Sequence, residues 1–317
     1  MKKIKKIKII GKAKIYETDD GKYVVKKEKK DLSNLFDYLS SRGITTFANR
    51  INKIDDLIRY EYVETSNFIN DSDYIEFIKN VAILHYKTAY FKTESRKVFK
   101  DIYNKLIDKV DYLKDYYNKL IEKIDNERFM SPSSYLIARN YTIISSNLYF
   151  IERELNSWYN LVKDQTKTRV CIVNNNLKFD NFIKGNKLIF TSWDNYLVDT
   201  PIIDIYKIYR NEYKSTDMTT LFKEYNSVFK LNDEEIKLFN IMISFPISIN
   251  LECSEYNKVR SVKEMLDYTY RTSKFISSGV FKELIHENTQ KEKKNDIASW
   301  WINKRENSLP KYQDNIN

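Results

Sequence analysis

The stretch that decides the fold reads Val173-Asn174-Asn175-Asn176-Leu177-Lys178-Phe179-Asp180-Asn181-Phe182-Ile183, and then Leu188-Ile189-Phe190-Thr191-Ser192-Trp193-Asp194. The run 169–173 at its start predicts a strand. Two short β-prone segments flank Lys184-Gly185-Asn186-Lys187, which predicts a hairpin. A polar turn and a hairpin therefore interrupt sequence that is otherwise mainly helical.

Upstream of this block, residues 4–30 predict strands. Asp19-Asp20-Gly21 lies between the β-prone runs 15–18 and 22–26, and Asp-Gly between such runs is a strong hairpin signal. A short helix follows, ended by Gly43, because four apolar side chains share one helical face: Leu32, Leu35, Phe36 and Leu39. Two further β-prone runs occupy residues 47–51 and 56–63.

From about Ser72 the apolar period is helical. The predicted stripe of the first helix contains Ile75, Ile78, Val81, Ala82 and His85. Residues 97–125 are expected to form a helix hairpin. Ser131-Pro132 starts another helix, with a stripe of Leu136, Ile143, Leu148, Ile151 and Leu155. After Pro201 the chain is expected to be mostly helical to about residue 307. The fold class is therefore α+β, with a small antiparallel β-rich lobe (1–64) and a large helical lobe (65–317) that contains the block 169–204.

Composition excludes several classes of protein. The chain has 317 residues, of which 42% are hydrophobic and 31% charged, so it is neither disordered nor collagen-like. The absence of a long apolar run argues against a membrane span, and the N-terminus lacks the pattern of a signal peptide. Cys171 and Cys253 match no metal spacing, and a cytoplasmic location is expected. The net charge of +10 is dispersed among interleaved Lys and Glu, which argues against a nucleic-acid partner.

The order of elements and the block 173–204 resemble the aminoglycoside/choline kinase-like phosphotransferase family. Within that family the chain is most similar to the spore-coat-associated kinase-like proteins of low-GC Gram-positive bacteria. The resemblance covers roughly residues 8–275 and includes hinge-like Tyr60-Glu61-Tyr62-Val63-Glu64 and the helix segment Leu84-His85-Tyr86-Lys87-Thr88. It implies a two-lobed protein-kinase-like fold. It also suggests that the protein is associated with a spore coat.

The resemblance also assigns positions in the catalytic loop, which in the family reads His-x-Asp-x-x-x-x-Asn. Asn174 stands at the His position, Asn176 at the catalytic Asp and Asn181 at the metal-binding Asn. An amide accepts no proton at neutral pH and brings no negative charge to orient a hydroxyl group. The second metal position is either Ser192 or Asp194. Ser192 is preferred, because Trp193 then keeps the place of the family's aromatic residue.

The nucleotide-binding positions implied by the resemblance lie in the first lobe. Lys26 is the candidate for the lysine that contacts the nucleotide phosphates, with Lys27 as the alternative. Gly11 is the single glycine of the loop expected over the phosphates, and Glu61 and Val63 belong to the hinge-like segment. The lysine usually pairs with an acid on the following helix. There Asp37 points away from the apolar face and Asp31 lies near the N-cap, so neither is well placed.

These assignments lead us to expect a degenerate phosphotransferase, a pseudokinase that acts by binding a protein or a small molecule between its lobes. ATP and Mg²⁺ are expected to bind weakly or not at all. Two alternatives stay open: an active kinase of a small hydroxylated substrate that uses Asp180 or Asp194, and a nucleic-acid-binding helical protein. His85 is expected to be a hydrogen-bonded core residue, and Asp204 to hold the loop backbone.

Overall fold

The structure is a computed structural model of the chain. It describes all residues except 1–3, 12, 55, 65–69, 186 and 279–317. The chain divides into two compact units, Met1–Phe275 and Ile276–Asn317.

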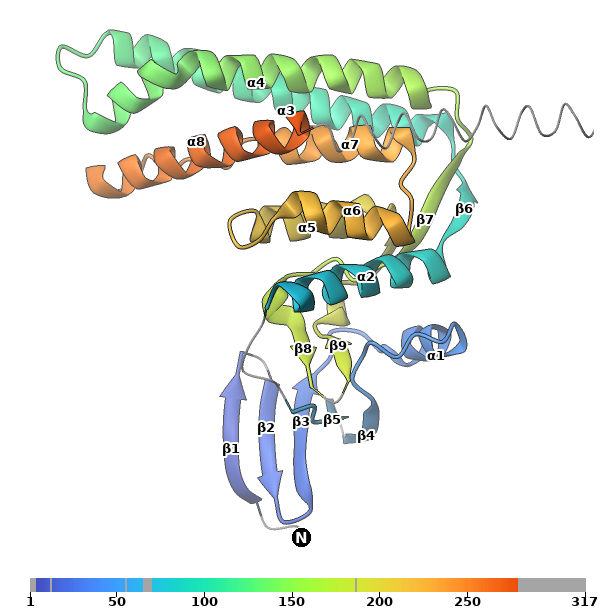
Figure 1. Cartoon of the computed structure of the whole chain (residues 1–317). Helices are drawn as coiled ribbons and strands as arrows, with labels where there is room; N and C mark the ends of the chain where they lie inside the picture. The colour runs from blue at the N-terminus through green and yellow to red at the C-terminus, as the bar shows by residue number, and fades with distance from the viewer. Residues whose placement is uncertain (1–3, 12, 55, 65–69, 186, 279–317) are drawn as a thin grey trace, which may run out of the picture. The chain divides into compact units, whose positions relative to one another are not determined.

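The N-terminal part is one five-stranded antiparallel sheet in the order β1-β2-β3-β5-β4 (Figure 1). Its strands are β1 (Ile4–Ile10), β2 (Ala13–Thr18), β3 (Gly21–Lys27), β4 (Arg50–Ile54) and β5 (Leu57–Glu61). The predicted hairpin at Asp19-Asp20-Gly21 is confirmed, since β2 pairs with β3 in continuous register from Thr18 opposite Gly21 to Ala13 opposite Lys26. Gly21 has φ +123°, a backbone conformation that favours glycine at this turn.

The predicted short helix is α1 (Ser33–Ser41), and its apolar face is buried as expected. Gly43 follows it with φ +65°, the left-handed conformation common after a helix C-terminus.

The remainder of the described chain is mainly helical. The helices are α2 (Asp71–Thr88), α3 (Arg96–Asp125), α4 (Pro132–Val162), α5 (Ile202–Glu212), α6 (Met218–Val228), α7 (Asp233–Ser244) and α8 (Glu255–Ser277). Among the described residues, no helix combines the length and apolarity needed to cross a bilayer. The part of the expected helical region beyond residue 278 lies outside the described residues.

The helix hairpin expected within residues 97–125 is wrong. This segment is the single helix α3 of 30 residues. It contains neither Gly nor Pro, and its buried residues Phe99, Val110, Tyr117 and Ile124 keep helical spacing throughout. The hairpin is formed instead by α3 and α4, which lie side by side (Figure 1).

Ser131 caps α4 as predicted, because its hydroxyl accepts a hydrogen bond from the Ser134 N–H at 3.2 Å. The predicted stripe is one residue off in the first half of the helix. Ile137 and Ile144 are buried, whereas Ile143 is 50% exposed. The prediction took Leu136 in place of Ile137 and Ile143 in place of Ile144. The members of each pair are adjacent and both apolar, so apolarity alone does not show which one is buried.

The predicted strand before the polar turn is β7 (Lys167–Val173). It is the middle strand of a second antiparallel sheet, between β10 (Leu197–Asp199) and β6 (Tyr90–Thr93), a short exposed strand that the sequence did not indicate. The predicted hairpin is β8 (Phe182–Lys184) and β9 (Leu188–Phe190). The lobe boundary at residue 64 stays a prediction, because residues 65–69 lie outside the described part of the chain.

Candidate functional site

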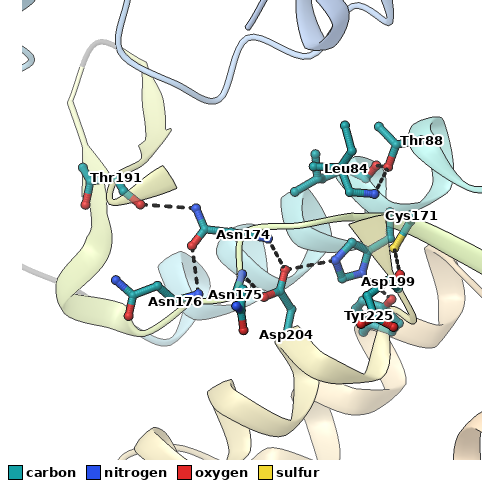
Figure 2. Close-up of polar contacts among 12 residues, drawn as sticks. Leu84, Thr88, Cys171, Asn174, Asn175, Asn176, Thr191, Asp199, Asp204 and Tyr225 are labelled. Carbon is teal, nitrogen blue, oxygen red and sulfur yellow. Dashed lines mark hydrogen bonds and ion pairs between the residues drawn. The ribbon is translucent and has the colours of Figure 1, made fainter. Parts of the chain in front are cut away.

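The polar turn after β7 is anchored from below by Asp204, in the first turn of α5. The Asp204 carboxylate is fully buried and accepts two backbone hydrogen bonds, from Asn174 N–H at 2.8 Å and from Asn175 N–H at 2.7 Å (Figure 2). Asn175 has φ +60°, which suits Asn better than most residues. The expected role of Asp204, holding the loop backbone, is confirmed.

Asp204 is in turn held by His85, which is fully buried on α2. His85 Nε2 lies 3.2 Å from the Asp204 carboxylate, and Nδ1 lies 2.7 Å from the Tyr225 hydroxyl on α6. The expectation that His85 is a hydrogen-bonded core residue is confirmed. Three hydrogen-bonded side chains thus connect α2, α5 and α6 directly beneath the turn.

Asn174, at the position of the family's His, is completely buried. Its side-chain oxygen accepts the Asn176 N–H at 3.2 Å, and its amide nitrogen donates to the Thr191 carbonyl at 3.3 Å. Both functional groups of the side chain therefore bind backbone within the site. Asn174 positions the turn and the segment after β9.

Asn176 and Asn181 are adjacent across the loop. The Asn181 amide nitrogen donates to the Asn176 carbonyl at 2.7 Å, which leaves the side-chain oxygen of Asn181 as an available ligand atom. The amide of Asn176 is half-buried and points away from Asp204 (Figure 2). Within the described part of the chain, no hydrogen bond to this amide is found. Asp180 does not join this group: its carboxylate is 82% exposed and pairs with Lys178 at 3.0 Å.

Lys26 on β3 forms an ion pair with Asp194, which lies in a single 3₁₀ turn, Trp193–Asn195. The Lys29 backbone N–H also donates to the Asp194 carboxylate, at 3.3 Å. Burial acts to raise the pKa of Asp194, but the hydrogen bond and charge of Lys26 outweigh it, so the pKa lies below its ordinary value. The alternative lysine, Lys27, lies in a different environment and pairs with exposed Asp56 at 2.8 Å.

Ser192 directly precedes that turn and adopts the left-handed conformation, with φ +62°. The next residue, Trp193, is buried. Its indole N–H donates to the Phe190 carbonyl at 2.8 Å, and its ring makes an edge contact with Phe36 of α1. Trp193 is therefore a packing residue between α1 and the segment after β9. Of the two candidates for the second metal position, Asp194 is the one that contacts Lys26 within the described part of the chain.

The remaining candidate nucleotide-binding residues, Glu61, Val63 and Gly11, lie in or beside the N-terminal sheet, and two of them contact neighbouring segments. Glu61 accepts hydrogen bonds from the backbone and side chain of Asn49, at 2.8 and 3.1 Å, and forms an ion pair with Lys187. Burial acts to raise the pKa of Glu61, and these partners together bring it below its ordinary value. Val63 is buried and lies against Gly185. Gly11, with φ +56°, occupies the turn between β1 and β2.

The acids near α1 do not contact Lys26, as expected. Asp31 accepts a hydrogen bond from the Ser33 N–H at 2.9 Å, and Asp37 is exposed. Sequence reasoning missed a buried cluster beside them, in which the Glu28 carboxylate accepts from Arg50 at 3.1 Å and from the Tyr60 hydroxyl. The pairs join residues far apart in the chain, so no spacing could indicate them.

Further contacts missed from the sequence join the end of β3 to the segment after β9. Lys30 donates to the Tyr196 carbonyl at 3.0 Å, and its ammonium lies 3.5 Å from the centre of the Tyr196 ring. Another contact missed from the sequence lies elsewhere: Lys207 of α5 donates to the Asn175 carbonyl in the turn after β7. In so Lys-rich a chain, nothing in the sequence separates these lysines from solvated ones.

Comparison with known proteins supports this fold. Over 89% of the chain, the structure matches 93% of an aminoglycoside phosphotransferase from Alicyclobacillus acidocaldarius, with a TM-score of 0.62 and 11% identity. The chain has the fold of a small-molecule phosphotransferase. The choline kinase LicA from Streptococcus pneumoniae matches over 87% of this chain and 94% of its own, with a TM-score of 0.46 and 14% identity. No protein-family model matches the chain, and the search of curated proteins found no match.

Proposed function

We propose that this chain is a degenerate phosphotransferase, a pseudokinase that acts by binding and has lost phosphoryl transfer. The observation that carries the proposal is the amide of Asn176. It stands between the loop anchor Asn174 and the candidate ligand Asn181, at the position that the sequence resemblance assigns to the catalytic carboxylate. General-base assistance contributes about 10²- to 10⁴-fold to the rate of a reaction, and an amide cannot supply it.

Two of the candidate side chains have the chemistry for a weakly held Mg²⁺–nucleotide. The Asp194 carboxylate, which pairs with Lys26, and the Asn181 amide oxygen are donor types that Mg²⁺ accepts beside nucleotide phosphates. Lys26 partly neutralises Asp194 and would itself bind a phosphate. Ile15 and Val24, half-buried cross-strand neighbours, project from the same face of the sheet as Lys26 and would cover an apolar base. If bound, the metal would neutralise the phosphate charges.

The alternative of an active enzyme using Asp180 or Asp194 has less support. Asp180 is exposed and paired with Lys178, and the Asp194 carboxylate is paired with Lys26. A carboxylate that binds the lysine is suited to holding a metal beside it, rather than to orienting an acceptor hydroxyl. The lobe boundary at residue 64 and association with a spore coat rest on the sequence resemblance and belong to this proposal.

The proposal is tested by measuring ADP release from Mg·ATP with a panel of acceptors. The panel contains an aminoglycoside, spectinomycin and choline, because the structural neighbours are phosphotransferases named for such molecules. We expect no phosphorylated product with the wild-type chain. Product formation that is lost on Asp194→Ala would instead establish an active enzyme.

A further inference from the structure

The strand β1 forms one edge of the five-stranded sheet, and all seven of its residues are exposed (Figure 1). Its inner edge pairs with β2, and no strand among the described residues pairs with its outer edge. An edge strand presents a row of backbone N–H and C=O groups that can pair with another extended segment.

The side chains of β1 are unusually apolar for an open edge. Its four isoleucines, Ile4, Ile7, Ile9 and Ile10, are all about half exposed or more. Successive side chains of a strand point to opposite faces, so apolar surface is exposed on both faces of this edge. Ile7 and Ile9 share one face, next to Tyr16 and Lys14 of β2. An added strand could cover these isoleucines with apolar side chains.

The lysines of β1 indicate which charge a strand added to this edge should carry. Lys5 is paired with Asp19 at 2.8 Å, and Lys6 lies opposite Glu17 on β2. Lys8 lies opposite Ile15, so its charge has no acidic cross-strand neighbour on that strand. A second copy of β1, paired antiparallel about Ile7, would place Lys6 of each copy opposite Lys8 of the other. Like charges directly opposite each other destabilise a sheet, which disfavours self-pairing of two copies in this register.

We propose that β1 is the docking edge for an extended, acidic segment of a partner protein, which adds to the sheet as a further strand. Backbone hydrogen bonds would supply much of the affinity, as in other cases of strand addition. Acidic side chains opposite Lys6 and Lys8 and β-branched side chains opposite Ile7 and Ile9 would supply the specificity. The inference concerns the outer edge of β1, two strands away from Lys26 in the sheet, and does not depend on loss of phosphoryl transfer.

The test uses the full chain and two synthetic peptides of about ten residues. One alternates glutamate with valine and threonine, and the other has lysine in place of glutamate. Binding is measured by fluorescence anisotropy, and the docking position by hydrogen exchange of the backbone amides. We expect the acidic peptide to bind at least about tenfold more tightly than the basic one and to protect amides of residues 4–10.

Charge reversal on exposed side chains makes the test specific without disturbing the core. Lys6→Glu/Lys8→Glu is expected to weaken the acidic peptide about tenfold and to strengthen the basic one. The control Lys100→Glu/Lys105→Glu makes the same change of net charge on α3 and is expected to leave the preference unchanged. Absence of binding at millimolar peptide, equal effects of both reversals, protection outside β1, or dimerisation through β1 would each overturn the proposal.

Discussion

The ammonium of Lys26 on β3 pairs with the carboxylate of Asp194, a residue 168 positions later in the chain. The pair connects the N-terminal sheet to the segment that follows the β8–β9 hairpin. It is partly buried, with side-chain exposures of 21% and 12%. The contact distinguishes Lys26 from Lys27, which pairs with Asp56 instead. It also distinguishes Asp194 from Ser192, which has no charge to pair with a lysine. The sequence had left both choices open.

Removing this lysine is expected to destabilise the protein. Lys26→Ala leaves the Asp194 carboxylate partly buried without its charged partner. Exposed ion pairs contribute about 0–1 kcal/mol and loss of a buried partner costs about 3–5 kcal/mol, so we expect a loss of about 1–3 kcal/mol in denaturant unfolding. Lys27→Ala, which removes the exposed pair with Asp56, is the matched control and should change stability far less than Lys26→Ala.

The same pair sets a pH dependence. The folded-state pKa of Asp194 lies below its ordinary value, so its contribution to stability is complete above that ordinary value. It is lost as the pH falls from the ordinary value of about 4 through the lower folded-state pKa. Unfolding measured from pH 6 to pH 2.5 should show a shallower acid slope for Lys26→Ala than for wild type. An unchanged slope would show that the pair does not hold the carboxylate ionised.

The buried carboxylate of Asp204 is expected to control the polar turn. In Asp204→Asn one oxygen acceptor is replaced by an amide N–H₂ group facing backbone N–H groups, so at least one buried donor loses its acceptor. We expect a loss of about 2–4 kcal/mol and faster hydrogen exchange at the amides of Asn174 and Asn175. Asp180→Asn removes an exposed carboxylate of the same region and should alter neither. Unchanged exchange in Asp204→Asn would contradict the anchoring role.

Gly185 is expected to tolerate no side chain. A Cβ there would overlap the Glu64 carbonyl oxygen and lie 3.0 Å from Val63 Cγ1, so backbone would have to move. We expect Gly185→Ala to cost about 1–3 kcal/mol in thermal or denaturant unfolding. Gly11→Ala is a useful comparison, because a Cβ at Gly11 would meet no atom within 4 Å and only its positive φ opposes it. A Gly185→Ala protein as stable as wild type would show that the hairpin does not pack closely on residues 63–64.

Nucleotide binding is expected to be weak and to increase with a second carboxylate. A ligand that binds only the folded state stabilises it by RT ln(1 + [L]/Kd), so a millimolar Kd gives about 0.4 kcal/mol at an equal ligand concentration. Calorimetry and thermal unfolding with Mg·ATP should detect a stronger response for Ser192→Asp, since Asp tolerates the left-handed backbone of Ser192. Asp194→Asn should abolish it. A shift of several degrees with the wild-type protein would contradict weak binding.

Much of the fold could be predicted from the sequence because its signals are local. The Asp-Gly turn, the apolar residues in and just before α1 and the short runs around Gly185 each specify their own element. The error over α3 arose because a long amphipathic helix and a helix hairpin share the same apolar period. The structure corrects this, since no turn interrupts Arg96–Asp125.

The site was less accessible to prediction than the fold. His85 was assigned its supporting role because a buried polar residue on an apolar stripe needs a partner. Asp204 was assigned its role from its place on the helix that follows the loop. The Lys26–Asp194 pair, the Glu28–Arg50 pair and the contact of Lys30 with Tyr196 depend on how the sheet meets the later segments. Such contacts have no signature in the spacing of residues along the chain.

ADP release from Mg·ATP, measured with the acceptor panel, tests the central claim most directly. Wild type should be indistinguishable from Asn176→Ala, because neither has a carboxylate at position 176. Asn176→Asp alone should gain little if metal is weakly held, whereas Asn176→Asp/Ser192→Asp should gain nucleotide binding and slow hydrolysis. The contrary result is wild-type turnover, with phosphorylated acceptor, that Asp194→Ala or Asp180→Ala abolishes.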